Sequence, residues 1–203
     1  MKITETELQS IRKLSSELGG VFTYVDLNVI FPTLHKNSFY RLLAKLEELG
    51  IIRRFIKGYY VTENFDLKIL SQKICNGSYI SFENVLASAG LIGTVSSKRI
   101  RAVKIGKNRT YENDSYNITH VAIARDLFFG YETVKGVKIA TKEKAFLDTL
   151  YFHTRGMAFQ FDLYSDMDVS LLDSNLVKQY LKPYKNPKFK KFITEYLKDH
   201  EVA

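Results

Sequence analysis

Residues 36–61 read KNSFYRLLAKLEELGIIRRFIKGYYV and decide the fold of the first third of the chain. Their apolar side chains recur at helical spacing: Phe39, Leu42, Leu43, Leu46 and Leu49. This pattern predicts a helix over residues 37–49 that Gly50 ends. Residues 51–56 are rich in β-formers, Lys57-Gly58 has the composition of a turn, and residues 59–61 are β-rich again. A two-stranded hairpin should therefore follow the helix.

The residues before this stretch predict two further helices. Thr4 and Glu7 have the spacing of a capping box, and a helical apolar pattern runs from them to the glycine pair after residue 18. Thr23 and Asp26 repeat the cap pattern and start a short helix that Pro32 stops. Three helices and a hairpin within about sixty residues describe a winged helix-turn-helix, whose third helix enters the major groove of DNA.

The polar face of the third predicted helix has the chemistry of a DNA contact. It carries hydrogen-bond donors and a flat aromatic ring: Lys36, Asn37, Ser38, Tyr40, Arg41 and Lys45. The two lysines are expected to hold phosphates and the other four to read base edges. The hairpin adds three cations for the backbone or minor groove: Arg53, Arg54 and Lys57. Glu47 and Glu48 are expected to lie away from the DNA.

Two less specific interpretations stay open for this module. Charged residues opposite an apolar stripe are often only a solvated helix face. Winged helices also serve as protein-docking modules, which would make the chain an adaptor without a role on DNA. The composition favours DNA, because 30 Lys and Arg against 22 Asp and Glu give a net charge of +8, which suits a polyanionic partner.

Composition and cysteine usage limit the compartment and the protein class. Hydrophobic residues make up 45% of the 203, as in globular proteins. The single cysteine, Cys75, allows no internal disulfide, and there is no CxxC motif for zinc. The first nine residues lack the apolar region of a secretory signal, and no apolar run approaches the length of a membrane span. We therefore expect a soluble, cytoplasmic protein with no membrane partner.

A polar break at residues 63–66 predicts a boundary between a winged-helix domain, 1–62, and a second domain, 66–203. The expected order there is a linking helix, a strand that runs into a helix capped by Ser81, several strands and then helices, which is α+β. Residues 99–105 and 109–112 are expected to form a hairpin, followed by a strand at 116–123 and a hairpin around Lys135-Gly136. Thr141 and Ser174 are the expected caps of later helices.

The last helices are rich in lysine. The cations are Lys178, Lys182, Lys185, Lys188, Lys190, Lys191 and Lys198, with aromatic residues interleaved. They could form a second surface for nucleic acid. Lysines on the solvated face of amphipathic helices give the same pattern, and this second interpretation is favoured.

The sequence shows no catalytic constellation. The four histidines lack metal-site spacing, and there is no GxSxG, P-loop or GxGxxG motif. We therefore expect no catalytic residue, no metal ligand and no cofactor. The open alternative is a metal-dependent, nucleic-acid-processing enzyme whose ligands converge only in space, for which the candidates are Asp114, Asp126, Glu143 and Lys144.

Five segments together resemble the AbiEi-type antitoxins. In the winged helix these are residues 20–27 (GVFTYVDL), 40–52 (YRLLAKLEELGII) and 57–60 (KGYY). In the second domain they are residues 79–92 (YISFENVLASAGLI) and 136–151 (GVKIATKEKAFLDTLY), of which the last is the specific one.

The resemblance implies an antitoxin of a type IV toxin–antitoxin pair that acts in phage defence by abortive infection. It implies that the winged helix binds inverted repeats in the operon's own promoter and represses it, and that the second domain supplies the antitoxin activity. The implied genetic partner is a nucleotidyltransferase-like toxin, with or without direct contact.

Overall fold

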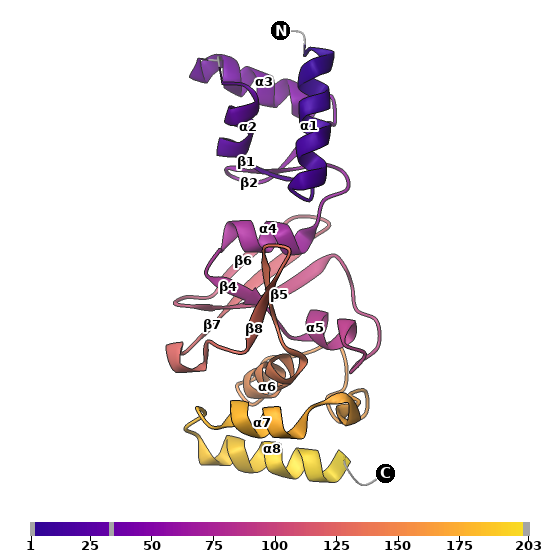
Figure 1. Cartoon of the computed structure of the whole chain (residues 1–203), viewed down its shortest axis with the longest axis vertical. Coiled ribbons are helices and arrows are strands. Elements are labelled where there is room, and N and C mark those ends of the chain that lie inside the picture. The colour runs from indigo at the N-terminus through magenta and orange to yellow at the C-terminus, as the bar shows by residue number, and fades with distance from the viewer. Residues whose placement is uncertain (1–2, 33–34, 201–203) are drawn as a thin grey trace. The chain divides into compact units, whose positions relative to one another are not determined.

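The computed structural model describes residues 3–32 and 35–200, and the chain divides into two compact units, Met1–Ile74 and Cys75–Ala203 (Figure 1). The fold is α+β, with a winged helix-turn-helix first and a mixed sheet with carboxy-terminal helices second, as expected. Among the described residues, no helix combines the length and apolar character needed to cross a bilayer.

The first unit has the element order of a winged helix. Its elements are α1 (Glu5–Glu17), β1 (Val21–Thr23), α2 (Tyr24–Ile30), α3 (Lys36–Glu48), β2 (Arg53–Ile56), β3 (Tyr59–Val61) and α4 (Leu67–Ile74). The three strands form an antiparallel sheet in the order β1-β3-β2. The predicted wing is therefore the β2–β3 hairpin, and β2 is its edge strand.

Local cap chemistry sets where the first two helices begin. The Thr4 and Thr23 side chains accept from the backbone N–H of Glu7 and Asp26, whose carboxylates accept from the two threonine N–H groups in return. Both predicted capping boxes are confirmed. After α1 the chain turns through the glycine pair, where Gly20 has φ +72°.

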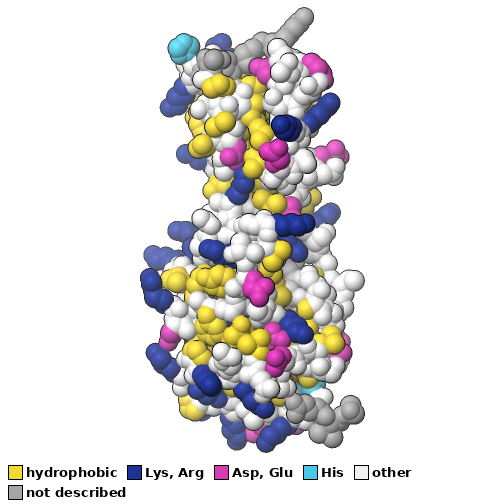
Figure 2. Space-filling view, viewed as in Figure 1, with side chains coloured by type: hydrophobic (Ala, Val, Ile, Leu, Met, Phe, Trp, Pro, Cys, Tyr) yellow, Lys and Arg dark blue, Asp and Glu magenta, His cyan; other side chains and the backbone are white. Residues whose placement is uncertain are grey.

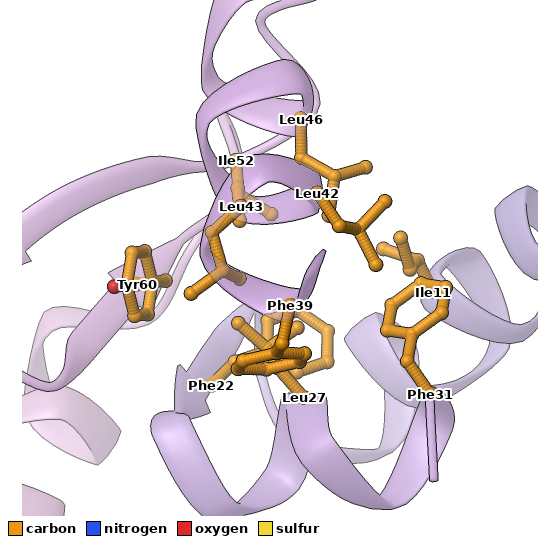
Figure 3. Packing of buried hydrophobic residues seen from close by; sticks show 10 residues of the cluster. All are labelled: Ile11, Phe22, Leu27, Phe31, Phe39, Leu42, Leu43, Leu46, Ile52 and Tyr60. Atoms are coloured by element: carbon orange, nitrogen blue, oxygen red, sulfur yellow. The ribbon is translucent and has the colours of Figure 1, made fainter. Parts of the chain in front are cut away.

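Ten buried side chains pack between α1, α2, α3 and the small sheet (Figure 3). They are Ile11, Phe22, Leu27, Phe31, Phe39, Leu42, Leu43, Leu46, Ile52 and Tyr60. Four of these come from α3, so burial of its apolar stripe fixes the rotation of the helix and turns the opposite face to solvent.

The helix α4 belongs to the first unit, whereas the predicted boundary lies before it, at residues 63–66. Lys73 Nζ donates to the carbonyl of Val21 at 3.0 Å and forms an ion pair with Asp26 at 2.9 Å. The Tyr59 hydroxyl donates to the Lys73 carbonyl at 3.1 Å. These contacts fasten the end of α4 to β1, α2 and the wing.

The second unit is built on a six-stranded mixed sheet in the order β6-β7-β5-β4-β9-β8. The strands are β4 (Ser78–Ile80), β5 (Arg99–Ile105), β6 (Arg109–Glu112), β7 (Asn117–Ile123), β8 (Tyr131–Val134) and β9 (Val137–Ala140). The helices are α5 (Glu83–Ser88), α6 (Lys142–His153), α7 (Ser174–Leu181) and α8 (Pro187–His200), with short turns η1 (Arg125–Leu127) and η2 (Val169–Leu171). Figure 1 shows α6 between the sheet and α7, which explains why most of α6 is buried.

Three expectations for the second unit are wrong. Residues 99–105 and 109–112 do not form a hairpin, because β7 lies between them, parallel to β5 and antiparallel to β6. The largely buried β5 and β7 take central places in the sheet, whereas the exposed β6 takes the edge. Ser81 does not cap α5, which begins after Phe82 without a side-chain cap. Asp173, rather than Ser174, caps α7.

Candidate nucleic-acid interface

Six of the nine predicted DNA-binding residues lie on α3. Lys36, Asn37, Tyr40 and Arg41 are exposed, and Ser38 and Lys45 are half-buried. At 100° per residue, Asn37 and Arg41 point away from the buried stripe of α3, which is formed by Phe39, Leu42 and Leu46. Tyr40 points sideways, between the buried face and the exposed face of the helix. Asn37 and Arg41 therefore occupy the face of α3 that a DNA groove would meet first.

A groove of 530 Å³ separates α3 from the wing, and three of the predicted residues line it: Tyr40, Arg54 and Lys57. The other lining residues are Tyr24, Leu43, Ala44, Glu47, Gly58 and Tyr60. The groove thus combines three tyrosines with two cations and one carboxylate. Aromatic rings beside cations are suited to sugar–phosphate and base contacts.

Two predicted cations lie elsewhere and have protein contacts of their own. The Arg53 guanidinium lies 5.6 Å from the centre of the Phe65 ring, on the opposite side of β2 from Arg54. Lys45 forms an ion pair with Glu48 at 3.0 Å. The structure therefore does not bring all three wing cations to one place, and Lys45 would have to exchange a carboxylate for a phosphate.

Glu47 was expected to lie away from the site, but it lines the groove between α3 and the wing. Its Oε1 accepts a hydrogen bond from the backbone N–H of Arg54 at 2.9 Å, so it lies inside the groove and joins α3 to the wing. Sequence periodicity placed Glu47 on α3, but it could not show that β2 returns beside that position. Glu48 is also exposed, and it forms an ion pair with Lys45 instead.

Two of the three groove tyrosines, Tyr24 and Tyr60, are not among the predicted contacts, because the sequence pattern marks them only as parts of α2 and of the wing. The Tyr24 and Tyr40 ring centres are 6.0 Å apart, and Tyr24 packs edge-on against Phe39 at 4.9 Å. Partial burial raises the pKa of Tyr60; the carboxylate of Glu47 raises it further and the Arg54 cation opposes it. Burial also raises the pKa of Tyr24, with Tyr40 adding to the shift. These phenols stay protonated donors at neutral pH.

The four residues of the alternative metal centre are not gathered. Asp114 is exposed, and Asp126 pairs with Lys185 at 3.0 Å. Glu143 is buried and accepts from the N–H of Asp173 at 3.2 Å. Within residues 3–32 and 35–200, no three His, Cys, Asp or Glu side chains come together as a metal site would require.

The second unit contains a buried polar cluster that the sequence did not reveal. Lys144 and Asp148, one turn apart on α6, form an ion pair in which both side chains are fully buried. Asp148 accepts from the hydroxyls of Tyr79 at 3.0 Å and Ser81 at 2.8 Å, and Lys144 donates to the Tyr184 hydroxyl at 3.2 Å. Burial lowers the pKa of Lys144 and raises that of Asp148, each opposed by its partner's charge. The pair lies in the core, beyond the reach of a ligand in solvent.

Figure 2 shows basic side chains at the end of the second unit that α7 and α8 form, and most of the lysines of this region are exposed. Lys178, Lys182, Lys185, Lys188, Lys191 and Lys198 are exposed and Lys190 is half-buried. Phe189, Ile193 and Tyr196 are buried beneath them. The amphipathic pattern explains how the two helices pack against the rest of the second unit.

The fold defines the chain as a winged helix-turn-helix joined to an α+β unit with a mixed sheet. The crystal structure of the Rv2827c protein from Mycobacterium tuberculosis shares this fold: the match has a TM-score of 0.59 and 13% identity, and it covers 93% of this chain and 75% of that one. No protein-family model matches the chain. No curated protein matches it in sequence.

Proposed function

We propose that the protein is a DNA-binding transcriptional autorepressor that acts as the antitoxin of a type IV toxin–antitoxin pair. The observation that carries the DNA-binding half is the exposed face of α3, with Asn37 and Arg41 opposite the core and Tyr40, Arg54 and Lys57 in the adjoining groove. Base-edge donors on the outward face and cations at its border are what sequence-specific binding needs.

The direct test is fluorescence anisotropy on the DNA upstream of the protein's own gene, beside a scrambled duplex, across a salt series. We expect a preference for the native duplex that persists at physiological salt. Equal binding to both duplexes with steep salt dependence would mean that net charge alone is acting, and the repressor proposal would fall. A flat salt dependence would favour the adaptor alternative.

Arg41→Ala tests the outward face of α3. We expect it to weaken operator binding by about 1–3 kcal/mol and to affect scrambled DNA less, as for the loss of one base contact. Arg12→Ala is the matched control, because Arg12 is also exposed on a helix of the same unit but lies on α1. An equal loss on both duplexes would reduce Arg41 to a phosphate contact.

The antitoxin half of the proposal is supported by the resemblance of residues 136–151, which form β9 and α6. Under this proposal the chain has no catalytic role of its own. The test is co-expression of a neighbouring nucleotidyltransferase-like gene with the full chain. Restored growth supports the proposal, and growth arrest that the full chain does not relieve contradicts it. Binding of the two purified proteins shows whether relief requires contact.

A protein-docking role is the second candidate, and one observation favours it. Val25 and Val29, one turn apart on α2, are 66% and 70% exposed. Such a pair of apolar side chains on one helix face can seat a partner. Val25→Ser with Val29→Ser separates the two roles: unchanged operator binding with loss of a co-purifying partner supports docking, and unchanged behaviour in both assays removes it.

A further inference from the structure

Among the described residues that line the groove between α3 and the wing, Glu47 supplies the one negative charge. It accepts the N–H of Arg54 from the outer edge of β2, where no further strand pairs within the three-stranded sheet. A helix side chain thus satisfies a backbone donor of an edge strand. Because hydrogen bonds to a carboxylate are stronger than neutral ones, this contact holds the wing at a set distance from α3.

The charge of Glu47 has a second effect. Arg54 and Lys57 line the same groove, and with Glu47 neutral they would offer a phosphate two cations without opposition. A carboxylate in the same groove repels phosphate oxygens at short range. DNA that seats through its backbone alone would meet this repulsion in any sequence, whereas DNA read through Asn37 and Arg41 gains contacts on the outer face.

We propose that Glu47 is a specificity-determining residue of the DNA-binding surface, an inference that rests on the proposed repressor function. It acts in two ways: it positions the wing through Arg54, and it weakens binding to DNA of the wrong sequence. Discrimination between partners often needs such a repulsive element beside the attractive ones.

Three variants separate the two effects. Glu47→Gln keeps an oxygen that can accept from Arg54 and removes the charge. Glu47→Asp keeps the charge on a side chain too short to reach Arg54, and Glu47→Ala removes both. Glu17→Gln is the matched control, because Glu17 is an exposed glutamate of α1 and gives the same change of net charge. Circular dichroism shows which variants fold.

The expected results differ between the variants. Glu47→Gln should tighten binding to a scrambled duplex by roughly two- to fivefold at low salt, because one repulsion is lost, and should lower the operator-to-scrambled ratio. Glu47→Asp and Glu47→Ala should speed hydrogen exchange of the Arg54 amide by about tenfold or more, measured by NMR, and weaken operator binding. Glu17→Gln should leave the ratio within twofold of the unmodified protein.

Two results would overturn the inference. Scrambled-duplex binding by Glu47→Gln that matches the Glu17→Gln control would remove the effect of charge. An unchanged exchange rate for Arg54 in Glu47→Asp would remove the positioning role. Neither measurement uses the operator, so both can fail while the repressor proposal stands. The repressor proposal itself would fail if the unmodified protein bound the operator and the scrambled duplex equally.

Discussion

Replacing either residue of the buried ion pair on α6 should destabilise the second unit. The stability of the two variants should change with pH in opposite directions. Lys144 and Asp148 have fully buried side chains, and each is the other's counter-ion. Asp148→Asn would leave the ammonium of Lys144 with the Tyr184 hydroxyl and neighbouring aromatic rings, of which Phe129 is nearest at 5.0 Å. Removing one member of a buried pair typically costs about 3–5 kcal/mol.

Proton loss limits that cost. A lysine with an ordinary pKa of 10.5 can become neutral at pH 7 for about 5 kcal/mol, at 1.36 kcal/mol per pKa unit, so Asp148→Asn should cost no more than about 5 kcal/mol through the charge. In this variant the pKa of Lys144 in the folded state lies below its unfolded value. The unfolded chain then binds more protons, and stability should rise as pH increases toward 10.5.

The stability of Lys144→Met should change with pH in the opposite direction. Asp148 keeps its hydrogen bonds from Tyr79 and Ser81 but loses its counter-ion, so its pKa in the folded state should lie above the ordinary 3.8. The folded chain then binds the extra proton, and stability should rise as pH falls from 7 toward 4. In the double variant neither charge is present, and its cost should be less than the sum of the two single costs by about 2–3 kcal/mol.

The assay is urea unfolding at pH 5, 7 and 9, followed by far-ultraviolet circular dichroism. The chain has no tryptophan, so hydrogen exchange of peptides from α6 assigns the transition to the second unit. Single variants that cost less than about 1 kcal/mol, or that respond to pH in the same direction, would refute the claim that a charged pair lies in the core.

Three further predictions concern the first unit. Burial raises the pKa of Asp26, but hydrogen bonds from Thr23 and Lys73 outweigh this effect and lower the pKa. The stability that the carboxylate adds above pH 3.8 should therefore be lost as the pH falls through the pKa of Asp26 in the folded state. Acid unfolding of Asp26→Asn, compared with that of the unmodified chain, measures this loss. Gly20→Ala should lower the free energy of unfolding by about 2 kcal/mol or more, because φ is +72° and the added Cβ would lie 2.7 Å from the Asn64 carbonyl oxygen. Gly58→Ala, with open space around its Cβ position, should lower it by only about 1 kcal/mol. Paired urea titrations compare the two variants. Thr4→Ala should cost about 1 kcal/mol in the same assay through the lost capping box.

Local chemistry made much of the first unit predictable. The cap residues Thr4 and Thr23 lie three residues from their partners, so the signal and the contact both fit within one helical turn. The periodicity of α3 defined its buried stripe, and exposure of Asn37 and Arg41 followed from the same pattern. Whether these residues contact DNA stays a prediction, because exposure is necessary for binding but not sufficient.

Long-range pairing was not predictable in the same way. The turn after β5 has the composition of a hairpin, yet β7 is placed between β5 and β6 because two strands with buried faces gain most from central positions. Ser81 has the chemistry of a cap, but its hydroxyl donates to Asp148, 67 residues away along the chain. A polar side chain has several possible partners, and only the assembled fold selects among them.

The buried cluster also bears on what the family resemblance can mean. Residues 136–151 are the specific part of that resemblance, and in the structure they supply α6, whose Lys144 and Asp148 have no exposed surface. A pattern of this kind is explained by packing alone, because loss of either member of a buried ion pair leaves the other charge uncompensated. It therefore supports a shared fold more strongly than a shared activity. The antitoxin activity that we propose for the second unit would need exposed residues, so folded variants of the lysines on α7 and α8 test that proposal more directly than any change within α6.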